Sequence, residues 1–517
     1  MKKILGIHFK WFWLFFAFGA GLTFAVGWYI EFHVLSNDYW NILYYGRRMT
    51  LSEPESLYNG FYPFGYPFLV GQMPFTYVLP LSYLLNALLA GLFTASVSTL
   101  ILSTRSIPAT ILAFFSSIAA PFVFQNANTL SPDIGSAAFT AFAVYLLCRQ
   151  WFDEDQTELE APQAVMIGVS LGLSFLWRTH AAVSFLAILA GWLLLFGIRP
   201  FRLRLFLLGA LALVAGMQVA VNLISGHGVF ETAQAFNLYK FFYGVDWTHP
   251  PGPEEIAGFS LINTIAENPV RAFDLYKPFF LYFISHAWAA VLAYLLSPKG
   301  RFAHFSLFSL IFIVLYAIPI SLSDSARSPV ILMSIYLPSV AVLLAAFVEL
   351  AQKYIGVKNW VQWVVTALFV AVGFQTFYGW VIYDIGLIRT ARSEYRVFTT
   401  IEYTLRASGM TSPNEVFADR YDFYTPNTMP YHPRQIGEWS EDWFWGLRDE
   451  YPSLPNDSWD AFAKACREQG VRFLVLGPNS HYRGDIFPQI YNDGVNLQEL
   501  GLQFIGQRGN MRIYGIQ

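Results

Sequence analysis

An aspartate and two arginines follow the first apolar run of the sequence, at a spacing that suits chemistry at a membrane surface. Asp38 lies a few residues beyond this run, and Arg47 and Arg48 follow nine and ten residues later. In a helix, that spacing spans about 14 Å. A carboxylate and a guanidinium on one segment at the membrane interface could contact an acceptor hydroxyl and a donor phosphate, respectively. The alternative is structural: Asp38 caps a helix and the arginines contact lipid phosphates.

Further charged residues stand at the ends of later apolar runs. Asp133 precedes the fourth run, where it or Ser131 could simply cap a helix. Arg178 separates the fifth and sixth runs. An ionisable residue at such a depth usually serves a site or an ion pair, unless it snorkels to the headgroups. Lys277 and Arg327 lie just outside the eighth and tenth runs, where either could bind a phosphate or anchor the chain at the interface.

These residues require a membrane framework to position them. The chain has 517 residues, of which 55% are hydrophobic and 13% are charged, whereas about 25% charged residues is typical of soluble domains. The sequence therefore predicts an all-α polytopic membrane domain over residues 1–384, with about eleven transmembrane helices. The predicted spans cover residues 11–31, 79–103, 107–125, 134–149, 164–178, 181–197, 205–225, 278–297, 305–322, 329–351 and 360–383.

The distribution of arginine and lysine predicts the orientation, because short cytoplasmic loops carry an excess of these residues. With the N-terminus in the cytoplasm, Arg105, Arg149, Arg199, Lys299 and Lys353 all fall in short inner loops. An odd number of spans then places the C-terminal region outside. We therefore expect a multi-pass protein of the plasma membrane with an extracytoplasmic C-terminus.

Two long outer loops, at about residues 31–78 and 225–277, mix apolar, aromatic and polar residues at helical spacing. This pattern is typical of helices that lie in the interface plane. The first loop ends in the stretch from Asn59 to Pro67, which holds two prolines and two glycines. Such a composition is not expected to form a regular helix.

The composition changes from Asp384 onward, where charges become frequent and apolar runs shorten. A helix is expected between the start signal at residues 456–458 and Gly470, followed by a strand over residues 471–476. Residues 504–508 and 511–516 are expected to form a hairpin. The sequence thus predicts a small extracytoplasmic α/β domain over residues 385–517.

The layout argues against several functional classes. No P-loop, HExxH or paired CxxC motif is present, and the inner loops are too short to hold a nucleotide-binding domain. The net charge of −3 gives no indication of a nucleic-acid partner. An enzyme site at the outer face lacks cytosolic ATP and nucleotide sugars, so its donor must be activated already and held in the membrane. A sugar linked to a polyprenyl phosphate meets both conditions. The alternatives are a transporter or lipid flippase of envelope glycans, and a non-catalytic assembly or receptor protein.

Several short motifs, in this order and topology, resemble those of the GT-C glycosyltransferases. They are Asp38 after the first span, the Pro/Gly/aromatic stretch at the end of the first loop, Ser131-Pro132-Asp133 before the fourth span, the run from Gly168 to Arg178, and Arg327 followed by Tyr336-Leu337-Pro338. The branch that looks most similar comprises the dolichyl-phosphate-mannose protein mannosyltransferases and the bacterial lipid A aminoarabinose transferases. The resemblance runs over most of the chain.

The resemblance implies roles for individual residues. Asp38 matches the presumed catalytic base, and Asp133 matches the acidic residue of the second outer loop. Arg178 and Arg327 match basic positions near the donor phosphate. Relatives often pair the first aspartate with a neighbouring acid, whereas its neighbours here are Asn37 and Tyr39. The Lys-Pro-Pro stretch of the aminoarabinose branch reads Tyr-Pro-Phe-Gly over residues 62–65 of this chain, which leaves the sugar and the acceptor of that branch in question.

The expected reaction is an inverting glycosyl transfer to a lipid, glycan or protein acceptor, with Asp38 as general base. Arg178, Arg327, Arg47 and Lys277 are the candidates for binding the donor phosphate. We expect Tyr39, Tyr62 and Tyr66 to line the substrate pocket.

Nothing in the sequence requires a cofactor, although Mg²⁺ or Mn²⁺ could take part. If a metal is used, Asp38 and Asp133 are the best candidate ligands, and Asp133 could instead orient the acceptor. His227, His249, Glu254 and Glu255 in the second outer loop fit no tight metal-site template.

Overall fold

The structure is a computed structural model of the chain. It describes all residues except 1–8, 35–36, 59, 61, 153–158, 197–200, 230–234, 244–257, 322–328, 355–359, 413–414, 419–453, 456–457 and 479–485.

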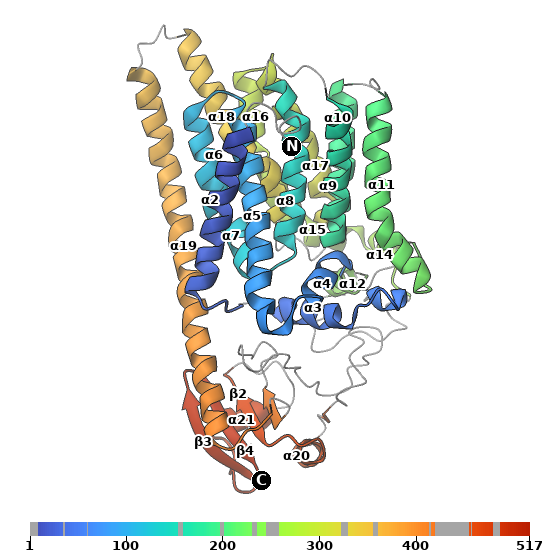
Figure 1. The fold of residues 1–517 in the computed structure, drawn as a ribbon, viewed down its shortest axis with the longest axis vertical. Coiled ribbons are helices and arrows are strands. Elements are labelled where there is room, and N and C mark those ends of the chain that lie inside the picture. Colours follow the sequence, from blue (N-terminus) through green and yellow to red (C-terminus); the bar gives the residue numbers. More distant parts are fainter. Residues whose placement is uncertain are drawn as a thin grey trace.

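A helix, or a pair of helices, occupies each of the eleven predicted spans, and these helices stand side by side as a bundle (Figure 1). They are α2 (Phe9–Tyr29), α5 (Val78–Leu102), α6 (Ile107–Ala119) with α7 (Pro121–Asn128), α8 (Asp133–Cys148), α9 (Ala161–Trp177), α10 (Ala182–Phe196), α11 (Phe201–Ile224), α15 (Pro269–Ser285) with α16 (Trp288–Leu296), α17 (Arg301–Ile320), α18 (Val330–Tyr354) and α19 (Trp360–Ala407).

Length and apolarity single out fewer helices as membrane spans. Among the described residues, six stretches qualify, and the bent pair α6 and α7 makes a seventh. The pair turns by 43° at Ala120, where the following proline disfavours helical backbone and Ala120 is extended, with φ −62° and ψ 122°. Helices α8, α9 and α10 have only 16, 17 and 15 residues, against the roughly 20 that cross a bilayer. The count of eleven spans therefore stays a prediction.

Small residues let the membrane helices approach each other closely. This is typical of helices in lipid, where the hydrophobic effect does not drive helix association and close packing does. Helix α5 crosses α2 at Gly91, where an added Cβ would lie 2.7 Å from the carbonyl oxygen of Phe16 and 2.9 Å from the Cβ of Ala20. Helix α9 crosses α11 at Gly168, where a Cβ would lie 2.2 Å from the carbonyl oxygen of Leu207. Glycine at these crossings sets the distance between the helices.

The first long loop packs against one end of the bundle. It contains α3 (Asn37–Arg48), the 3₁₀ helix η2 (Pro54–Leu57), α4 (Gly65–Gly71) and the 3₁₀ helix η3 (Phe75–Tyr77). The expectation of no regular helix up to Pro67 is wrong at its last residues, because α4 begins at Gly65. Pro67 lies in the first turn of α4, where its missing N–H group would have no partner in the helix anyway. The backbones of α3 and α4 touch at Gly46 and Gly71.

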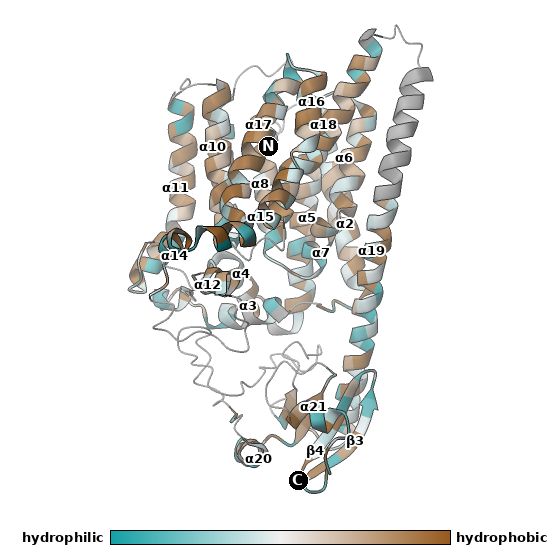
Figure 2. Cartoon of the chain, turned by 180° about the vertical axis from the view of Figure 1, so that it is seen from behind, coloured by the Kyte–Doolittle hydropathy of each residue, from teal (hydrophilic) through white to brown (hydrophobic). Residues whose placement is uncertain are grey.

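The second long loop contains two short helices among its described residues, α12 (Ala235–Tyr243) and α14 (Leu261–Glu267). Both lie at the end of the bundle that also carries α3, α4 and the C-terminal sheet (Figure 1). The segments that the sequence places outside the membrane thus share one end of the molecule. Hydrophobic residues predominate along the bundle, and hydrophilic ones are frequent on the lower half of α19 (Figure 2).

The C-terminal region forms a four-stranded mixed sheet in the order β1-β2-β4-β3. Its strands are β1 (Val416–Ala418), β2 (Phe473–Leu476), β3 (Leu502–Arg508) and β4 (Met511–Ile516), and its helices are α20 (Trp459–Glu468) and α21 (Ile486–Tyr491). Strands β1 and β2 are parallel, and β4 is antiparallel to both β2 and β3. The predicted helix, strand and hairpin are therefore confirmed, although residues 456–457 of the predicted helix start lie outside the described residues.

Helix α19 connects the bundle to this sheet without a break. It passes through the predicted domain boundary at residue 384 and ends at Ala407. Its last turns contribute Phe398, Ile401 and Leu405 to a buried cluster with Val416 and Phe473 of the sheet. The other face of the sheet packs on α20 and α21. That residues 385–517 form a separate domain stays a prediction.

The crossing of α2 and α5 yields a first prediction. Gly91→Ala should lower the melting temperature of the detergent-solubilised protein, because overpacking of this kind costs about 1–3 kcal/mol. Gly209→Ala in α11 is the matched control, since an added Cβ there meets nothing within 4 Å. Equal melting temperatures for the two variants would contradict the close crossing.

Candidate active site

The ends of α8 and α9 meet in a two-pronged ion pair between Asp133 and Arg178. The guanidinium Nε donates to Oδ1 at 2.8 Å and Nη2 donates to Oδ2 at 2.9 Å. The side chains are only 18% exposed for Arg178 and 7% for Asp133. Charge-assisted pairs of this geometry are strong and fix the plane of the guanidinium. Arg178 therefore has a defined orientation at the surface of the bundle.

Two neighbours complete the surroundings of the Asp133 carboxylate. The Ser131 hydroxyl donates to Oδ2 at 2.7 Å and accepts the backbone N–H of Asp133 at 3.2 Å. His180 Nε2 lies 3.8 Å from Oδ1. That nitrogen is buried and has no hydrogen-bond partner among the described residues. The carboxylate also lies in the first turn of α8, where the helix dipole favours negative charge.

The structure settles two alternatives that the sequence leaves open. The N-cap position of α8 is held by Pro132, not by Ser131 or Asp133 as expected. The Ser131 hydroxyl nevertheless accepts the backbone N–H of Asp133, the first residue of the helix. Arg178 likewise does not extend freely to the headgroups, because it is paired with Asp133.

The first loop brings Tyr62 and Asp38 to this ion pair. The Arg178 guanidinium carbon lies 5.6 Å from the centre of the Tyr62 ring. Burial raises the pKa of the Tyr62 phenol well above its usual range, and the Asp38 charge raises it further, while Arg178 opposes the shift. Tyr62 is thus a neutral hydrogen-bond donor at any ordinary pH. Asp38 interacts electrostatically with both Tyr62 and Arg178.

Asp38 itself lies in the first turn of α3, and its side chain is exposed. The neighbouring Tyr39 is buried and forms a hydrogen bond of 2.9 Å with the hydroxyl of Ser82 on α5. Consecutive residues of a helix point about 100° apart. Burial of Tyr39 therefore holds Asp38 at the surface of the loop, where its charge interacts with Arg178.

Tyr39 and Tyr66 hold the first loop on the bundle. Tyr66 is 0% exposed, and its hydroxyl lies 2.9 Å from the carbonyl oxygen of Leu130 and 3.2 Å from Oδ1 of Asn86. Tyr39 is 1% exposed. The hydroxyls of both tyrosines are used within the protein, which gives these residues a positioning role. Their predicted place in a substrate pocket stays a prediction, as does that of Tyr62.

Two glycines allow the three parts of the site to converge. An added Cβ on Gly135 of α8 would lie 2.3 Å from Cδ1 of Trp177, the residue before Arg178. A Cβ on Gly65 at the start of α4 would lie 2.6 Å from the carbonyl oxygen of Leu176. The first loop and the start of α8 thus both pack closely against the last turn of α9.

A row of hydroxyls fastens α8 to α9 beneath the ion pair. Ser174 Oγ lies 2.9 Å from Oγ of Ser136 and 3.0 Å from Oγ1 of Thr140. Ser136 and Ser174 each donate to the other's carbonyl oxygen, at 3.1 and 2.9 Å. Such contacts between helices satisfy buried polar groups away from water. They keep Asp133 and Arg178 in register.

The other predicted phosphate-binding residues lie elsewhere. Arg47 is exposed in the last turn of α3, and nine residues of helix turn it to the face opposite Asp38. Lys277 is exposed within α15, which begins at Pro269, and its Nζ lies 5.5 Å from the Phe273 ring. Lys277 is therefore inside a helix that begins before the predicted eighth span, and its role in phosphate binding stays a prediction. Arg327 lies outside the described residues.

The candidate metal ligands that the structure describes do not form a cluster. Among the described residues, no group of three or more His, Cys, Asp or Glu side chains could hold a metal ion. Both oxygens of Asp133 already accept hydrogen bonds from Arg178 or Ser131. A carboxylate whose oxygens are both engaged in this way does not fit a Mg²⁺ or Mn²⁺ site at Asp133. His249, Glu254 and Glu255 lie outside the described residues.

His180 is the site residue that the sequence analysis did not identify. It follows Arg178 by two residues, in the 3₁₀ helix η5 (Thr179–Ala181) that separates α9 from α10. The sequence shows a histidine in a very short connection between two apolar runs. That signal alone does not indicate that its ring faces Asp133.

Comparison with known proteins identifies the fold. A scan against protein-family models finds no match, and neither does a search of curated sequences. In three dimensions the chain is similar to ArnT from Cupriavidus metallidurans, solved bound to undecaprenyl phosphate, with a TM-score of 0.57, 13% identity and 99% of each chain covered. The archaeal oligosaccharyltransferase AglB from Archaeoglobus fulgidus, solved with an inhibitory peptide and a dolichol-phosphate, gives a TM-score of 0.43 at 14% identity, over 98% of this chain and 75% of that one. The chain thus has the GT-C fold that its motifs predict.

A double-mutant cycle tests the ion pair. Asp133→Ala and Arg178→Ala should each destabilise the protein, because removing one partner of a buried pair costs roughly 3–5 kcal/mol. The double variant should lose less than the sum of the two, by about 1–3 kcal/mol. The loss is measured as the drop in melting temperature in detergent. Additive losses would contradict a direct interaction.

The exposed pair Arg301 and Glu349 supplies the control for this cycle. Its Nη2 to Oε2 distance is also 2.9 Å, but its side chains are 29% and 53% exposed. Glu349→Ala should change stability by less than about 1 kcal/mol.

Proposed function

We propose that the chain is an integral-membrane glycosyltransferase that moves a sugar from a polyprenyl-phosphate donor to an acceptor at the extracytoplasmic face. The transferred group is a hexosyl or pentosyl unit. The observation that carries the proposal is the Arg178 guanidinium, which Asp133 holds in place and whose charge interacts with that of the exposed Asp38. The likeness of the whole fold to ArnT, which was solved with undecaprenyl phosphate, supports the choice of donor.

Arg178 is suited to binding a phosphate. An arginine has five N–H donors, and Asp133 accepts two of them. The other three have no hydrogen-bond acceptor among the described residues. Because the ion pair fixes the guanidinium in advance, no ordering cost arises when a donor phosphate binds to these groups. Asp133 in this scheme positions Arg178 and does not act on the substrate.

Asp38 is suited to the role of general base. Its side chain is exposed, in a loop anchored by the hydrogen bond of Tyr39 to Ser82 and by the Gly46 contact with α4. In the proposed reaction, the acceptor hydroxyl oxygen attacks the anomeric carbon and its proton passes to Asp38. The bond from that carbon to the phosphate oxygen breaks at the same time, and the polyprenyl phosphate leaves with the electron pair. This single displacement inverts the anomeric centre.

Charge on the leaving phosphate increases as the reaction proceeds. Arg178 would stabilise this charge, and the neutral Tyr62 phenol above it could donate a further hydrogen bond. Removing one such donor typically costs about 10²–10³-fold in rate. The transition state should resemble an oxocarbenium ion, as in other glycosyl chemistry. No step of this scheme requires a metal ion.

The alternative function, a transporter or flippase of envelope glycans, has less support. The sites of such proteins lie near the middle of the bilayer. The ion pair here connects helix ends, and Asp38 and Tyr62 come from a loop at the same end of the bundle. Charged residues gathered at one face favour transfer at that face.

The Asp38→Asn variant tests the assignment of the base. Wild type and variant, purified in detergent with matched melting temperatures, would be offered radiolabelled polyprenyl-phosphate sugars and membrane-extract acceptors. We expect transfer by the wild type and a loss of at least about 100-fold in the variant. Donor binding should be retained, because Asp38 does not hold the phosphate. Glu53→Gln in the same loop is the control, as Glu53 is also an exposed carboxylate.

Equal transfer by wild type and Asp38→Asn would remove Asp38 from the chemistry. If the wild type neither bound nor transferred any of the polyprenyl-phosphate sugars offered, the glycosyltransferase proposal would be overturned and the transporter favoured.

The Arg178→Lys variant tests the phosphate role. It retains the charge but loses the planar fork that holds two acceptors at once. We expect turnover to fall by about 10²-fold, with a weaker affinity for the polyprenyl-phosphate donor. An unchanged affinity and turnover, measured in the same assay, would exclude Arg178 as the phosphate-binding residue.

A further inference from the structure

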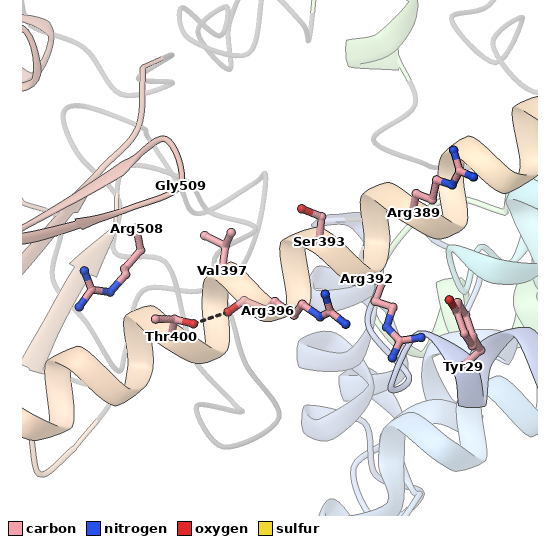
Figure 3. A pocket seen from close by; sticks show the side chains of 9 residues that line it. All are labelled: Tyr29, Arg389, Arg392, Ser393, Arg396, Val397, Thr400, Arg508 and Gly509. Carbon is pink, nitrogen blue, oxygen red and sulfur yellow. Dashed lines mark hydrogen bonds between the residues drawn. The ribbon is translucent and has the colours of Figure 1, made fainter.

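A cavity of about 590 Å³ lies where α19 leaves the membrane bundle, and four arginines line it. Arg389, Arg392 and Arg396 come from α19, and Arg508 comes from the end of β3 (Figure 3). Its volume is within the range of ligand pockets, about 300–1,000 Å³. We propose that this cavity binds the phosphate headgroup of an anionic membrane lipid, at a site separate from the Asp133–Arg178 ion pair.

The charges of the cavity are all of one sign. Residues 389, 392 and 396 are three and four positions apart, so they share one face of the helix, where like charges repel each other. Among the residues that the structure describes, no carboxylate lies within ion-pair distance of these arginines or of Arg508. The nearby Glu394 of α19 interacts instead with His33, at 3.2 Å. The cavity therefore has an excess of positive charge that an anion would neutralise.

The position of Arg392 indicates the depth of the cavity in the membrane. Its guanidinium carbon lies 4.3 Å from the centre of the Tyr29 ring, and Tyr29 is the last residue of α2, one of the membrane-span candidates. Trp28 and Tyr29 are both exposed there, as is typical of aromatic residues at the membrane interface. Arg392 thus stands at the level of the lipid headgroups, with Arg396 one helical turn farther from the bilayer.

The arrangement of the elements leaves the cavity accessible from the lipid phase. Helix α19 stands at the edge of the bundle, with α2 beside it and the sheet at its far end (Figure 1). The turn between β3 and β4 closes one side, because Gly509 approaches α19 so closely that an added Cβ would lie 3.2 Å from Cγ2 of Val397. A lipid at the perimeter of the bundle could therefore place its headgroup between α19 and this turn.

The chemistry of the side chains favours phosphate over other anions. Guanidinium groups bind phosphate through two parallel hydrogen bonds, and several of them on one face suit a group with several acceptor oxygens. A soluble phosphate compound has the same chemistry as a headgroup. The depth set by Tyr29 and the position at the edge of the bundle favour the lipid. The three arginines of α19 carry this argument, because the Arg508 guanidinium donates to the carbonyl oxygen of Gln507 at 2.8 Å and points away from them (Figure 3).

Lipid retention by the full chain tests this inference. The wild type, purified in detergent, would be mixed with equal amounts of phosphatidylglycerol and phosphatidylcholine, and bound lipids would be counted by native mass spectrometry. The double variant Arg392→Gln/Arg396→Gln should lose on the order of tenfold in its preference for phosphatidylglycerol. Lys464→Gln/Arg467→Gln is the matched control, because it removes two positive charges from α20 and should keep the preference. If the double variant does not fold, Arg396→Gln alone replaces it in the test, because Arg396 is exposed and its substitution should not disturb folding.

The same preference in wild type and in the folded cavity variants would overturn the proposal. A second arm separates the two phosphate sources. Inorganic phosphate in millimolar excess should not displace phosphatidylglycerol from the wild type. Displacement by inorganic phosphate, lost in the cavity variants, would instead assign the cavity to a soluble phosphate compound and overturn the lipid assignment.

Discussion

The two-pronged ion pair between Asp133 and Arg178 is the interaction on which the rest of the site depends. A charged arginine at the end of a membrane helix is costly unless it is paired, and the carboxylate in the first turn of α8 supplies the partner. The pairing requires the two helix ends to meet, which the small residues and hydroxyls of α8 and α9 permit. Because Asp133 uses one edge of the guanidinium, the remaining N–H donors are those that we propose to bind the donor phosphate.

The first loop adds the second half of the site through burial. Its aromatic residues are large and mostly buried, and their hydroxyls bind to α5 and to the segment before α8. This packing fixes a loop that would otherwise be mobile at the membrane surface. An exposed aspartate next to buried neighbours gains a defined position from them, as the proposed role of Asp38 as general base requires.

Helix α19 gives the C-terminal sheet a fixed place relative to the membrane. A continuous helix of 48 residues connects the bundle to the sheet, and its last turns share a buried cluster with residues of β1, β2 and β4. The arginine-lined cavity lies at the point where this helix changes from membrane to sheet surroundings. A lipid bound there would contact both the membrane bundle and the sheet.

The sequence by itself determined the class of the protein, because apolar runs and the spacing of charged residues are local properties. The helices of the spans, the C-terminal hairpin and the choice of Asp133 and Arg178 as residues of interest follow from such patterns. The GT-C fold was expected from the resemblance of several short motifs to those of a known family. Tertiary structure alone decided that these two residues bind each other, 45 positions apart in the chain. It also decided that His180 faces them, that Tyr39 and Tyr66 are buried, and that Lys277 lies inside a helix. Contacts between distant segments depend on how helices cross, and the pattern of a single segment carries no information about the surface that it will meet.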